Sequence, residues 1–299
     1  MRTVLGIDAA WTATEPSGVA LAKESDTGWE LVAAEDSYQH FVARAAGANV
    51  SGTRPAGSMP PIADLLHACI ALTGQRPDVV AIDMPLARSP IIQRRFADNA
   101  VSKAYGARKC GTHTPSATRP GSISDCLTSS FAEAGYSLAT EAIIPPCLIE
   151  VYPHPALVEL MSAPERLPYK MAKMRSYWPG IRGAERKQRL FANWSSIVQR
   201  LDRQIAGAAE RLRLPLLDAP NWALKSAEDL IDAAVCVWVG IAALDGHAQS
   251  FGDDDAAIWI PRPMGRDYAD APSPNARPLP ASLATFPVSV CQRSTATST

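Results

Sequence analysis

Two aspartates end apolar runs in this sequence, and the repeated pattern suggests shared chemistry. "VLGIDAAW" (4–11) closes its apolar run on Asp8, and "VVAIDMPLA" (79–87) repeats the pattern with Asp83. A charge at the end of a buried strand is costly unless a partner or a metal compensates it. Neighbouring strands lie roughly 4.8 Å apart, so pairing of these two strands would let both carboxylates share one metal ion. For either aspartate alone, the simpler interpretation is a residue that begins a loop in water.

Further acids lie among apolar residues later in the chain. Glu150 falls within the strand-like run "CLIEVYP" (147–153). Asp232 belongs to an expected apolar helix over 226–244, and apolar residues follow it at three, four and seven positions (Val235, Cys236 and Val239). An acid on the apolar stripe of a helix faces inward, so Asp232 is a candidate metal ligand.

Asp229 has two alternative roles that do not exclude each other. The run Ser226-Ala-Glu-Asp229 resembles a capping box, in which Asp229 accepts hydrogen bonds from free backbone amides at a helix start. A spacing of three also places Asp229 beside Asp232 on the helix surface, where it could serve as a ligand.

The elements that must position these acids follow from the hydrophobic pattern. Three strand-like runs near the start, including "VALAKES" and "GWELVAAEDSY", predict a three-strand meander. The run "IADLLHACIALTG" has helical spacing and leads into the strand that ends at Asp83. Because a strand, helix and strand in succession form a parallel crossover, we expect an α/β fold. A long charged helix is expected over 184–214.

The order of these features resembles the ribonuclease H-like superfamily, particularly its Holliday-junction-resolvase-like branch. The blocks "GIDAAW", "IDMPLA", "EVYPHPAL" and "DLIDAAVCVW" are more narrowly similar to the family catalogued as domain of unknown function four hundred and twenty-nine, described as predicted nucleases of that fold. The similarity implies an α/β fold of the ribonuclease H-like type, with a mixed central sheet of a three-strand meander plus parallel strands and helices on both faces.

The expected domain organisation follows from the same similarity, which covers roughly residues 3 to 260. We expect a single ribonuclease H-like domain over 1–264, with helical or loop insertions near 88–140 and 160–215. The remainder, 265–299, is rich in Pro, Ser and Thr and is expected to be a poorly ordered tail.

The resemblance also implies a mechanism and a set of site residues. In that superfamily, acidic residues bind two divalent cations that activate a water and stabilise the leaving oxygen of a phosphodiester. Carried over by position, Asp8 bridges the cations, and Asp83 and Asp232 are further ligands. Asp229 is an additional candidate ligand and Glu150 an additional candidate catalytic acid. Two-metal sites hold their ions roughly 3.5 to 4 Å apart, and hard carboxylate oxygens suit Mg²⁺ or Mn²⁺.

A basic segment directly follows the strand that ends at Asp83. Between 88 and 119 a single acid, Asp98, is outnumbered by cations, and His113 lies in the loop "GTHTPSATRPG". The candidate substrate-binding residues are Arg88, Arg94, Arg95, Lys103, Arg108, Lys109, His113 and Arg119. Such side chains contact phosphates without reading sequence, which indicates a nucleic-acid substrate. The alternative is a solvated helix face followed by a charged loop.

Composition sets limits on other functions. The formal net charge of −1 over 299 residues produces no overall field that would attract nucleic acid, so binding must rest on a local basic surface. The six cysteines are scattered without a Cys-x-x-Cys pair, which argues against a zinc or redox motif. With neither a basic leader nor an apolar window long enough to span a membrane, the sequence predicts a cytoplasmic protein with no membrane association.

Two alternatives to a nuclease remain at this level. An actin-like phosphotransferase also begins with a strand aspartate, but its phosphate loops need glycine-rich turns, and "DAAWTATEPSG" contains only Gly18. A non-catalytic nucleic-acid-binding or partner-binding protein on a ribonuclease H-like scaffold is the second alternative, because a fold does not guarantee an activity.

Overall fold

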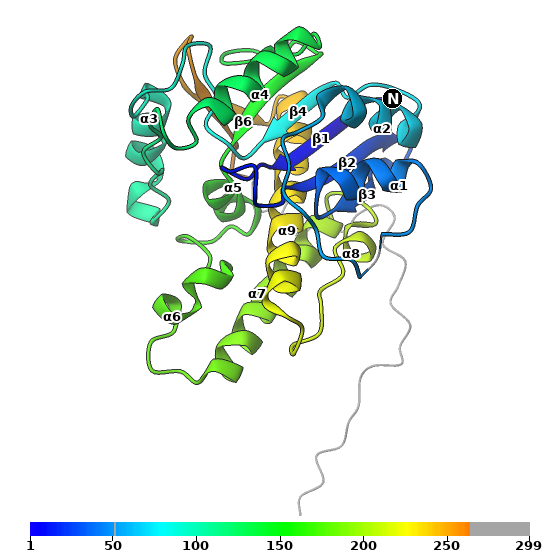
Figure 1. Ribbon diagram of the computed structural model, residues 1–299. Coiled ribbons are helices and arrows are strands. Elements are labelled where there is room, and N and C mark those ends of the chain that lie inside the picture. The colour runs from blue at the N-terminus through cyan, green and yellow to red at the C-terminus, as the bar shows by residue number, and fades with distance from the viewer. Residues whose placement is uncertain (51, 264–299) are drawn as a thin grey trace, which may run out of the picture.

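A mixed β-sheet forms the centre of the molecule (Figure 1). The computed structural model describes residues 1–50 and 52–263. Within them the strand order is β3-β2-β1-β4-β6-β8-β7, and the short β5 lies beside β6. The strands are β1 (Thr3–Asp8), β2 (Gly18–Ser25), β3 (Gly28–Glu35), β4 (Val79–Ile82), β5 (Ser137–Leu138), β6 (Cys147–Val151), β7 (Ala248–Gly252) and β8 (Ala257–Pro261).

The pairing directions divide this sheet into two parts. Strands β1, β2 and β3 pair antiparallel, as the predicted meander requires. Strands β1, β4, β6 and β8 run parallel to one another, and β7 closes the edge antiparallel to β8. The crossover from the meander into β4 passes through α2 (Ile62–Thr73), as expected. The fold is therefore mixed α/β, with an additional β7–β8 hairpin that the sequence pattern did not indicate.

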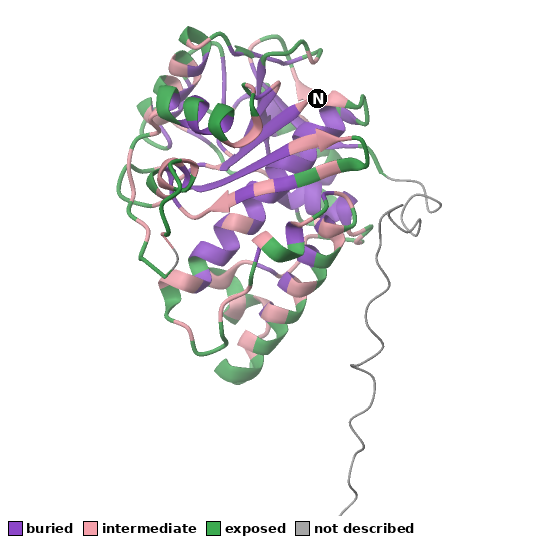
Figure 2. Ribbon diagram, turned by 90° about the vertical axis from the view of Figure 1, so that its right-hand side faces the viewer, coloured by how far each residue is buried: buried purple, intermediate pink, exposed green. Residues whose placement is uncertain are grey.

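Helices cover both faces of the sheet (Figures 1 and 2). Helices α1 (Tyr38–Ala45), α2 and α4 (Ser122–Glu133) share a core with Leu5 and Ile7 of β1. On the other face, α5 (Pro153–Leu160), α7 (Gly183–Asp202) and α9 (Asn221–Leu244) share a core with the alternate residues of the strands, such as Val4. Successive strand residues point to opposite faces of the sheet, so the side chains on both faces of each central strand are buried.

Helix α9 lies directly against the meander, and glycines make this approach possible. A Cβ atom added at Gly6 would lie 2.3 Å from the carbonyl oxygen of Ala233, and one at Gly18 would lie 2.3 Å from that of Asp229. Any side chain at these positions would therefore displace the helix. Since Gly18 pairs with Asp8 across the sheet, the contact also places Asp229 over the end of β1.

Two helix boundaries differ from the sequence prediction. Helix α9 begins at Asn221, after Pro220, so residues 226–229 lie inside the helix and Asp229 does not cap a helix start. Proline fixes its own φ near the helical value and lacks the N–H that a helix start would leave free, which favours a start here.

The charged helix expected over 184–214 ends at Asp202, and after Gly207, with φ of 81°, a short helix α8 (Ala208–Arg211) follows. The predicted tail lies outside the described residues.

The two segments that the sequence predicts as insertions both contain helices. The first contains α3 (Phe96–Tyr105), the 3₁₀ turn η1 (Gly106–Arg108) and α4. The second contains η2 (Met171–Lys173), α6 (Met174–Tyr177) and α7, and it projects from the body of the molecule (Figure 1). We refer to residues 171–189 as the α6–α7 arm. None of the helices in the described part of the chain has the length and apolar character needed to cross a membrane.

Candidate active site

Asp8 and Asp83 lie side by side at the ends of two paired parallel strands. Ile7 pairs with Ile82, and the backbone amide of Asp83 donates to the carbonyl oxygen of Ile7 at 2.8 Å. Residues in register on parallel strands point to the same face, and Gly6, two positions before Asp8, faces α9. Both carboxylates therefore point toward α9. Among the described residues neither carboxylate has a hydrogen bond or an ion pair.

The environment of Asp83 opposes its ionisation. Burial raises the pKa of Asp83 well above its ordinary value, and the negative charges of Asp8 and Asp232 raise it further. Lys170 acts in the opposite direction but does not cancel these effects. An unpaired carboxylate in such surroundings is stabilised by a cation.

Asp232 approaches the same region from α9. Its side chain is fully buried, as the apolar stripe predicted. The hydroxyl of Tyr169 donates to Oδ1 of Asp232 at 2.8 Å, and Nζ of Lys170 forms an ion pair with Oδ2. Burial raises the pKa of Asp232 to about 6, and the charge of Asp8 adds to this effect although Lys170 opposes it.

Asp229 and Glu228 complete the acidic end of α9. Both side chains are buried. Lys225, one turn earlier, forms an ion pair with Asp229, and its Nζ lies 3.4 Å from Glu228. Burial raises the pKa of Asp229 well above its ordinary value, and the charge of Asp8 raises it further. We call Asp8, Asp83, Glu228, Asp229 and Asp232 the carboxylate cluster.

The cluster supplies suitable donor atoms for a hard cation, but its members do not converge on one ion as they stand. Within residues 1–50 and 52–263, no group of three or more His, Cys, Asp or Glu side chains is arranged to hold a metal ion. Lys170 and Lys225 occupy the carboxylates of Asp232 and Asp229. The two strand aspartates are the unpaired members, and their oxygens are ligands of the kind that Mg²⁺ and Mn²⁺ take.

Glu150 forms an ion pair with Arg95 and is not a member of the carboxylate cluster. Its two oxygens accept hydrogen bonds from Arg95 at 2.6 and 2.7 Å, and one of them also accepts from the amide of Leu86. Arg95 pairs in turn with Asp98 at the start of α3. All three charged side chains are buried. The structure therefore uses Glu150 and Arg95 to fasten α3 to β6. Glu150 also lines the pocket described below, but Arg95 compensates its charge there.

Most cations of the basic segment 88–119 also make internal contacts. Arg88 donates to the carbonyl oxygens of Leu138 and Asp254, and Arg94 donates to several groups in 98–114. Arg108 pairs with Glu159, and Lys109 pairs with Glu165. Lys103, His113 and Arg119 are exposed. Of these three, His113 lines the pocket described next, and the guanidinium of Arg119 lies 5.6 Å from the ring centroid of Trp11.

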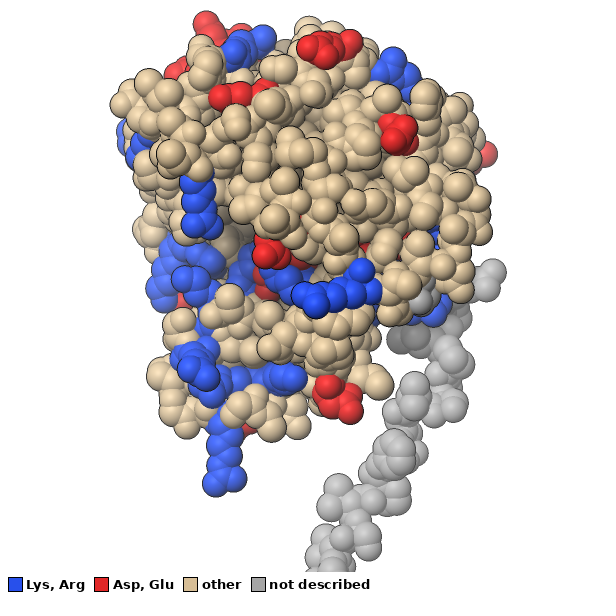
Figure 3. Space-filling view, viewed as in Figure 1, with Lys and Arg blue, Asp and Glu red and all other residues tan. Residues whose placement is uncertain are grey.

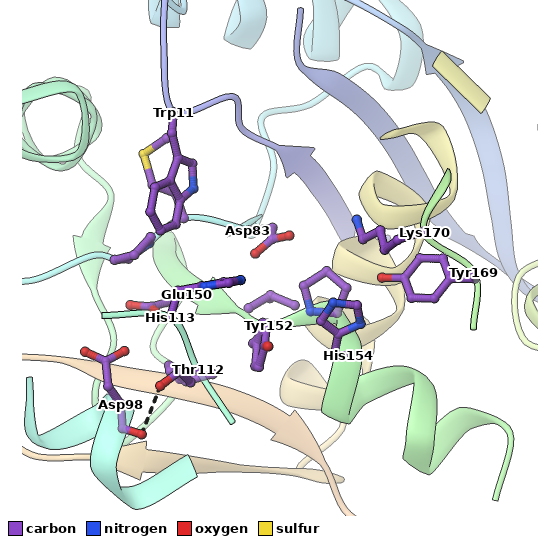
Figure 4. Close-up of a pocket in the computed structure, with 15 residues that line it drawn as sticks. Trp11, Asp83, Asp98, Thr112, His113, Glu150, Tyr152, His154, Tyr169 and Lys170 are labelled. Atoms are coloured by element: carbon purple, nitrogen blue, oxygen red, sulfur yellow. Dashed lines mark hydrogen bonds between the residues drawn. The ribbon is translucent and has the colours of Figure 1, made fainter. Parts of the chain in front are cut away.

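A pocket of about 210 Å³ adjoins Asp83. Figure 4 shows Trp11 on one side of the Asp83 carboxylate, Tyr152 and His154 on another, and Lys170 with Tyr169 beside it. Burial lowers the pKa of His154 well below its ordinary value, and the positive charge of Lys170 lowers it further, so the imidazole is neutral at physiological pH. The pocket thus joins aromatic walls to one member of the carboxylate cluster.

The α6–α7 arm carries a second basic surface. Residues 170–189 contain seven Lys or Arg and one acid, Glu185. Lys173, Arg175 and Arg182 are exposed, and Figure 3 shows Lys and Arg side chains gathered on the lower part of the molecule, over α6 and α7. Since Lys170 adjoins this segment and pairs with Asp232, the arm leads to the carboxylate cluster.

Lys170, Lys225, Glu228 and the basic arm were not predicted from the sequence. The excess of Lys and Arg over 170–189 was a signal for the arm. Glu228 lies four residues before Asp232, so helical periodicity placed the two on one face. Nothing in the sequence indicated that Lys170 would reach Asp232, which lies 62 positions later.

Comparison with known families is consistent with this geometry. Residues 6–257 match the model of the family described as protein of unknown function (DUF429). The chain belongs to this family. The match spans β1 with Asp8, β4 with Asp83 and the acidic end of α9, so every member of the carboxylate cluster falls within the family region. Searches of curated proteins and of solved structures returned no match for this DUF429 protein.

Proposed function

We propose that this DUF429 protein is a metal-dependent nuclease that hydrolyses phosphodiester bonds of DNA or RNA. The observation that carries the proposal is the pair of unpaired carboxylates, Asp8 and Asp83, in register at the ends of parallel strands and facing the acids of α9. Such an arrangement destabilises the fold unless a cation compensates it, and clustered carboxylates are how proteins hold Mg²⁺ or Mn²⁺ for phosphoryl chemistry.

The topology supports the same proposal. An antiparallel β3-β2-β1 unit continued by parallel β4 and β6, with acids at the ends of β1 and β4 and on a late helix, is consistent with a ribonuclease H-like fold. Activity on that scaffold depends on the site and not on the fold alone, so the carboxylate cluster carries the functional argument.

Each residue of the site has a distinct role in the proposed reaction. Divalent cations bound by Asp8, Asp83 and Asp232 would activate water and stabilise the leaving oxygen of the phosphodiester. Asp8 is central because its charge raises the pKa of Asp229, Asp232 and Asp83 alike. Lys170 pairs with Asp232 and lines the pocket. A cation on Asp232 would displace this ammonium group, which would then be available to a phosphate oxygen of the substrate. Asp229 forms an ion pair with Lys225 and is an additional candidate ligand for a cation.

The test combines cation binding with cleavage. We expect the wild-type protein to bind Mn²⁺ in a titration followed by electron paramagnetic resonance, and to cleave at least one of single-stranded, duplex or branched DNA or RNA with Mg²⁺ or Mn²⁺. Asp8→Asn should lose cation binding and abolish turnover while remaining folded. Asp26→Asn, at an exposed position in the β2–β3 turn, makes the same chemical change outside the cluster and should behave as wild type.

Equal cleavage by the wild-type protein and Asp8→Asn would contradict the proposed mechanism. The second candidate is a non-catalytic binding protein on the same scaffold, and the specific observation that favours it is the pairing of Asp232 with Lys170 and of Asp229 with Lys225. Nucleic-acid binding without Mn²⁺ binding and without cleavage would establish that alternative.

A further inference from the structure

The pocket beside Asp83 is built from aromatic side chains that come from separate parts of the chain. Trp11 follows β1, Tyr152 and His154 flank the start of α5, and Tyr169 precedes η2. Their rings surround a cavity of about 210 Å³ that Asp83 also lines (Figure 4). A catalytic acid at the wall of an aromatic cavity indicates that part of the substrate enters the cavity while the reacting bond stays outside it.

The aromatic walls are held in fixed positions. The His154 ring makes edge contacts with Tyr152 at 5.4 Å and with Tyr169 at 5.3 Å between ring centroids. The hydroxyl of Tyr152 donates to the carbonyl oxygen of Gly111 at 3.0 Å, and that of Tyr169 donates to Asp232. Both tyrosines thus use their polar ends in the fold, and a ligand would meet prepared surfaces without a rotamer penalty.

Trp11 forms the opposite, partly exposed wall. Its indole ring lies under the guanidinium of Arg119, with 5.6 Å between the guanidinium carbon and the ring centroid. A flat ring backed by a cation is suited to stacking on another flat ring. Polar groups at the rim, from Thr112, His113 and Lys170, supply hydrogen-bonding partners for the edge of such a ligand.

We propose that this pocket receives one unpaired nucleobase adjacent to the phosphate that is cleaved, so that the substrate is single-stranded or locally unpaired nucleic acid. The inference rests on the proposed nuclease function and names the substrate class for the same site. A cavity of roughly 150 Å³ accommodates benzene, so one of about 210 Å³ has room for a planar base. A base inside a duplex cannot enter because its faces and its edge are already occupied, and removing it costs unstacking energy.

The test measures binding without cleavage, in buffer containing EDTA. We expect the wild-type protein to bind a single-stranded oligonucleotide more tightly than the matching duplex in fluorescence anisotropy. Trp11→Ala should weaken binding of the single strand by about 5- to 150-fold, the range for loss of one base–aromatic stack. Trp11→Phe retains a ring and should recover most of the affinity, which separates stacking from a general disturbance of the fold.

A matched control and a modified ligand make the result specific. Trp29→Ala removes an indole near the far edge of the sheet, where the Trp29 ring contacts Arg2, and it should bind as wild type. A series of oligonucleotides with one abasic position each should show a single position at which wild-type affinity falls. At that position Trp11→Ala should lose nothing further, since the base and the indole contribute one shared interaction.

Equal affinity of Trp11→Ala and wild type, or additive losses at every abasic position, would overturn the inference. So would a preference for duplex in EDTA. Cleavage of duplex with Mg²⁺ under any of these three results would support the nuclease function without a base pocket. Conversely, stacking-dependent binding in a protein that cleaves no substrate would support the pocket and contradict the nuclease.

Discussion

Asp8 and Asp83 carry negative charge where the described fold offers no direct partner for either carboxylate. Their strands are otherwise apolar, and two half-buried acids at the ends of paired strands are unfavourable in the absence of a cation. Fold stability does not explain why both positions are acidic. The proposed cation binding would explain it, because the same repulsion that destabilises the free protein strengthens its attraction for a divalent cation.

Asp83→Asn should stabilise the metal-free protein in a pH-dependent manner. Because the pKa of Asp83 is raised in the folded state, the folded protein binds that proton more tightly than the unfolded chain does. The contribution of this carboxyl group to stability is therefore most favourable at low pH and falls as the pH rises through the raised pKa. At pH 8 in EDTA we expect the midpoint of thermal unfolding to rise by about 2–4 °C, which corresponds to ~1 kcal/mol for a domain of this size.

Calorimetry of Asp83→Asn and Asp26→Asn between pH 5 and 8 checks this expectation. The contribution of Asp232 to folding stability falls between pH 3.8 and about 6 for the same reason. The Asp83→Asn variant should therefore retain part of the pH dependence of the wild-type protein. A variant that is less stable than wild type at pH 8 would show that Asp83 has a stabilising partner and would remove the electrostatic argument for a cation site.

Glu150→Gln should act on stability and not on cation binding. It removes the charge that compensates buried Arg95, and breaking one partner of a buried ion pair costs about 3–5 kcal/mol. We expect a loss of this order in urea unfolding, with Mn²⁺ affinity of the folded protein unchanged. Glu133→Gln, at an exposed position of α4, is the control. Loss of Mn²⁺ binding with normal stability would instead make Glu150 a ligand.

Asp8, Asp83 and Asp232 could be selected as candidates from the sequence because each interrupts a local apolar pattern. The pairing of Glu150 with Arg95 could not be predicted from the sequence, since it joins residues 55 positions apart. Both were expected to face a substrate, and the structure pairs them with each other. A single sequence shows which charges are misplaced locally, but it does not show which of them will meet in space.

At the scale of elements, the approach of α9 to the meander is what brings the acids together. Gly6 and Gly18 leave no side chain between β1, β2 and the helix, so the backbone of α9 lies within contact of both strands. Asp229 and Asp232 occupy the turns of α9 that lie nearest to Asp8 as a result. The position of the helix, more than any single side chain, therefore sets the geometry of the carboxylate cluster.

Gly6→Ala should therefore damage both the fold and the site. Its Cβ would lie 2.3 Å from the carbonyl oxygen of Ala233, a backbone atom that cannot move without the helix. Overpacking of this kind costs about 1–3 kcal/mol, and we expect that loss in chemical denaturation together with weaker Mn²⁺ binding. Gly106→Ala is the matched control, because nothing lies within 4 Å of its added Cβ. Wild-type stability of Gly6→Ala would show that α9 does not pack as described.

Element prediction succeeded where periodicity was long and failed at boundaries. The meander, the crossover through α2 and the existence of α9 followed from the pattern of apolar residues. The start of α9 did not, because Ser226-Ala-Glu-Asp229 satisfies the capping pattern while the helix already begins at Asn221. The β7–β8 hairpin was also missed, because "QSFGDDDAAI" combines a short strand with charged turn residues.

At the scale of the whole molecule, the distribution of charge matters more than its sum. The formal net charge is −1, yet residues 170–189 carry seven Lys or Arg against one acid. The excess of cations over 88–119 predicted a basic surface there. In the structure most of these cations make internal contacts, namely Arg88, Arg94, Arg95, Arg108 and Lys109. A count of charges does not distinguish cations that join elements of the fold from cations that remain available to a ligand. Their partners become visible only in the folded structure.

The α6–α7 arm should bind the phosphate backbone of the substrate. Arg175, Arg182 and Arg186 have no hydrogen-bond or ion-pair partner for their side chains among the described residues, and they continue from Lys170 at the pocket wall. Replacing all three with Gln should weaken single-strand binding in EDTA. The slope of log Kobs against log salt concentration should become less steep by about 2, because each phosphate contact on a single strand contributes about 0.7.

A control triple variant, Arg44→Gln with Arg203→Gln and Arg213→Gln, removes the same charge from positions outside the arm. If binding depended only on net charge, both triple variants would lose the same affinity and the same salt dependence. Phosphate contact at the arm requires a difference, since screened charges more than a Debye length of about 8 Å from the strand contribute little at physiological salt. Equal slopes for the two variants would show that another surface binds the phosphate backbone. The exposed cations Lys103 and Arg119 would then be the next residues to replace.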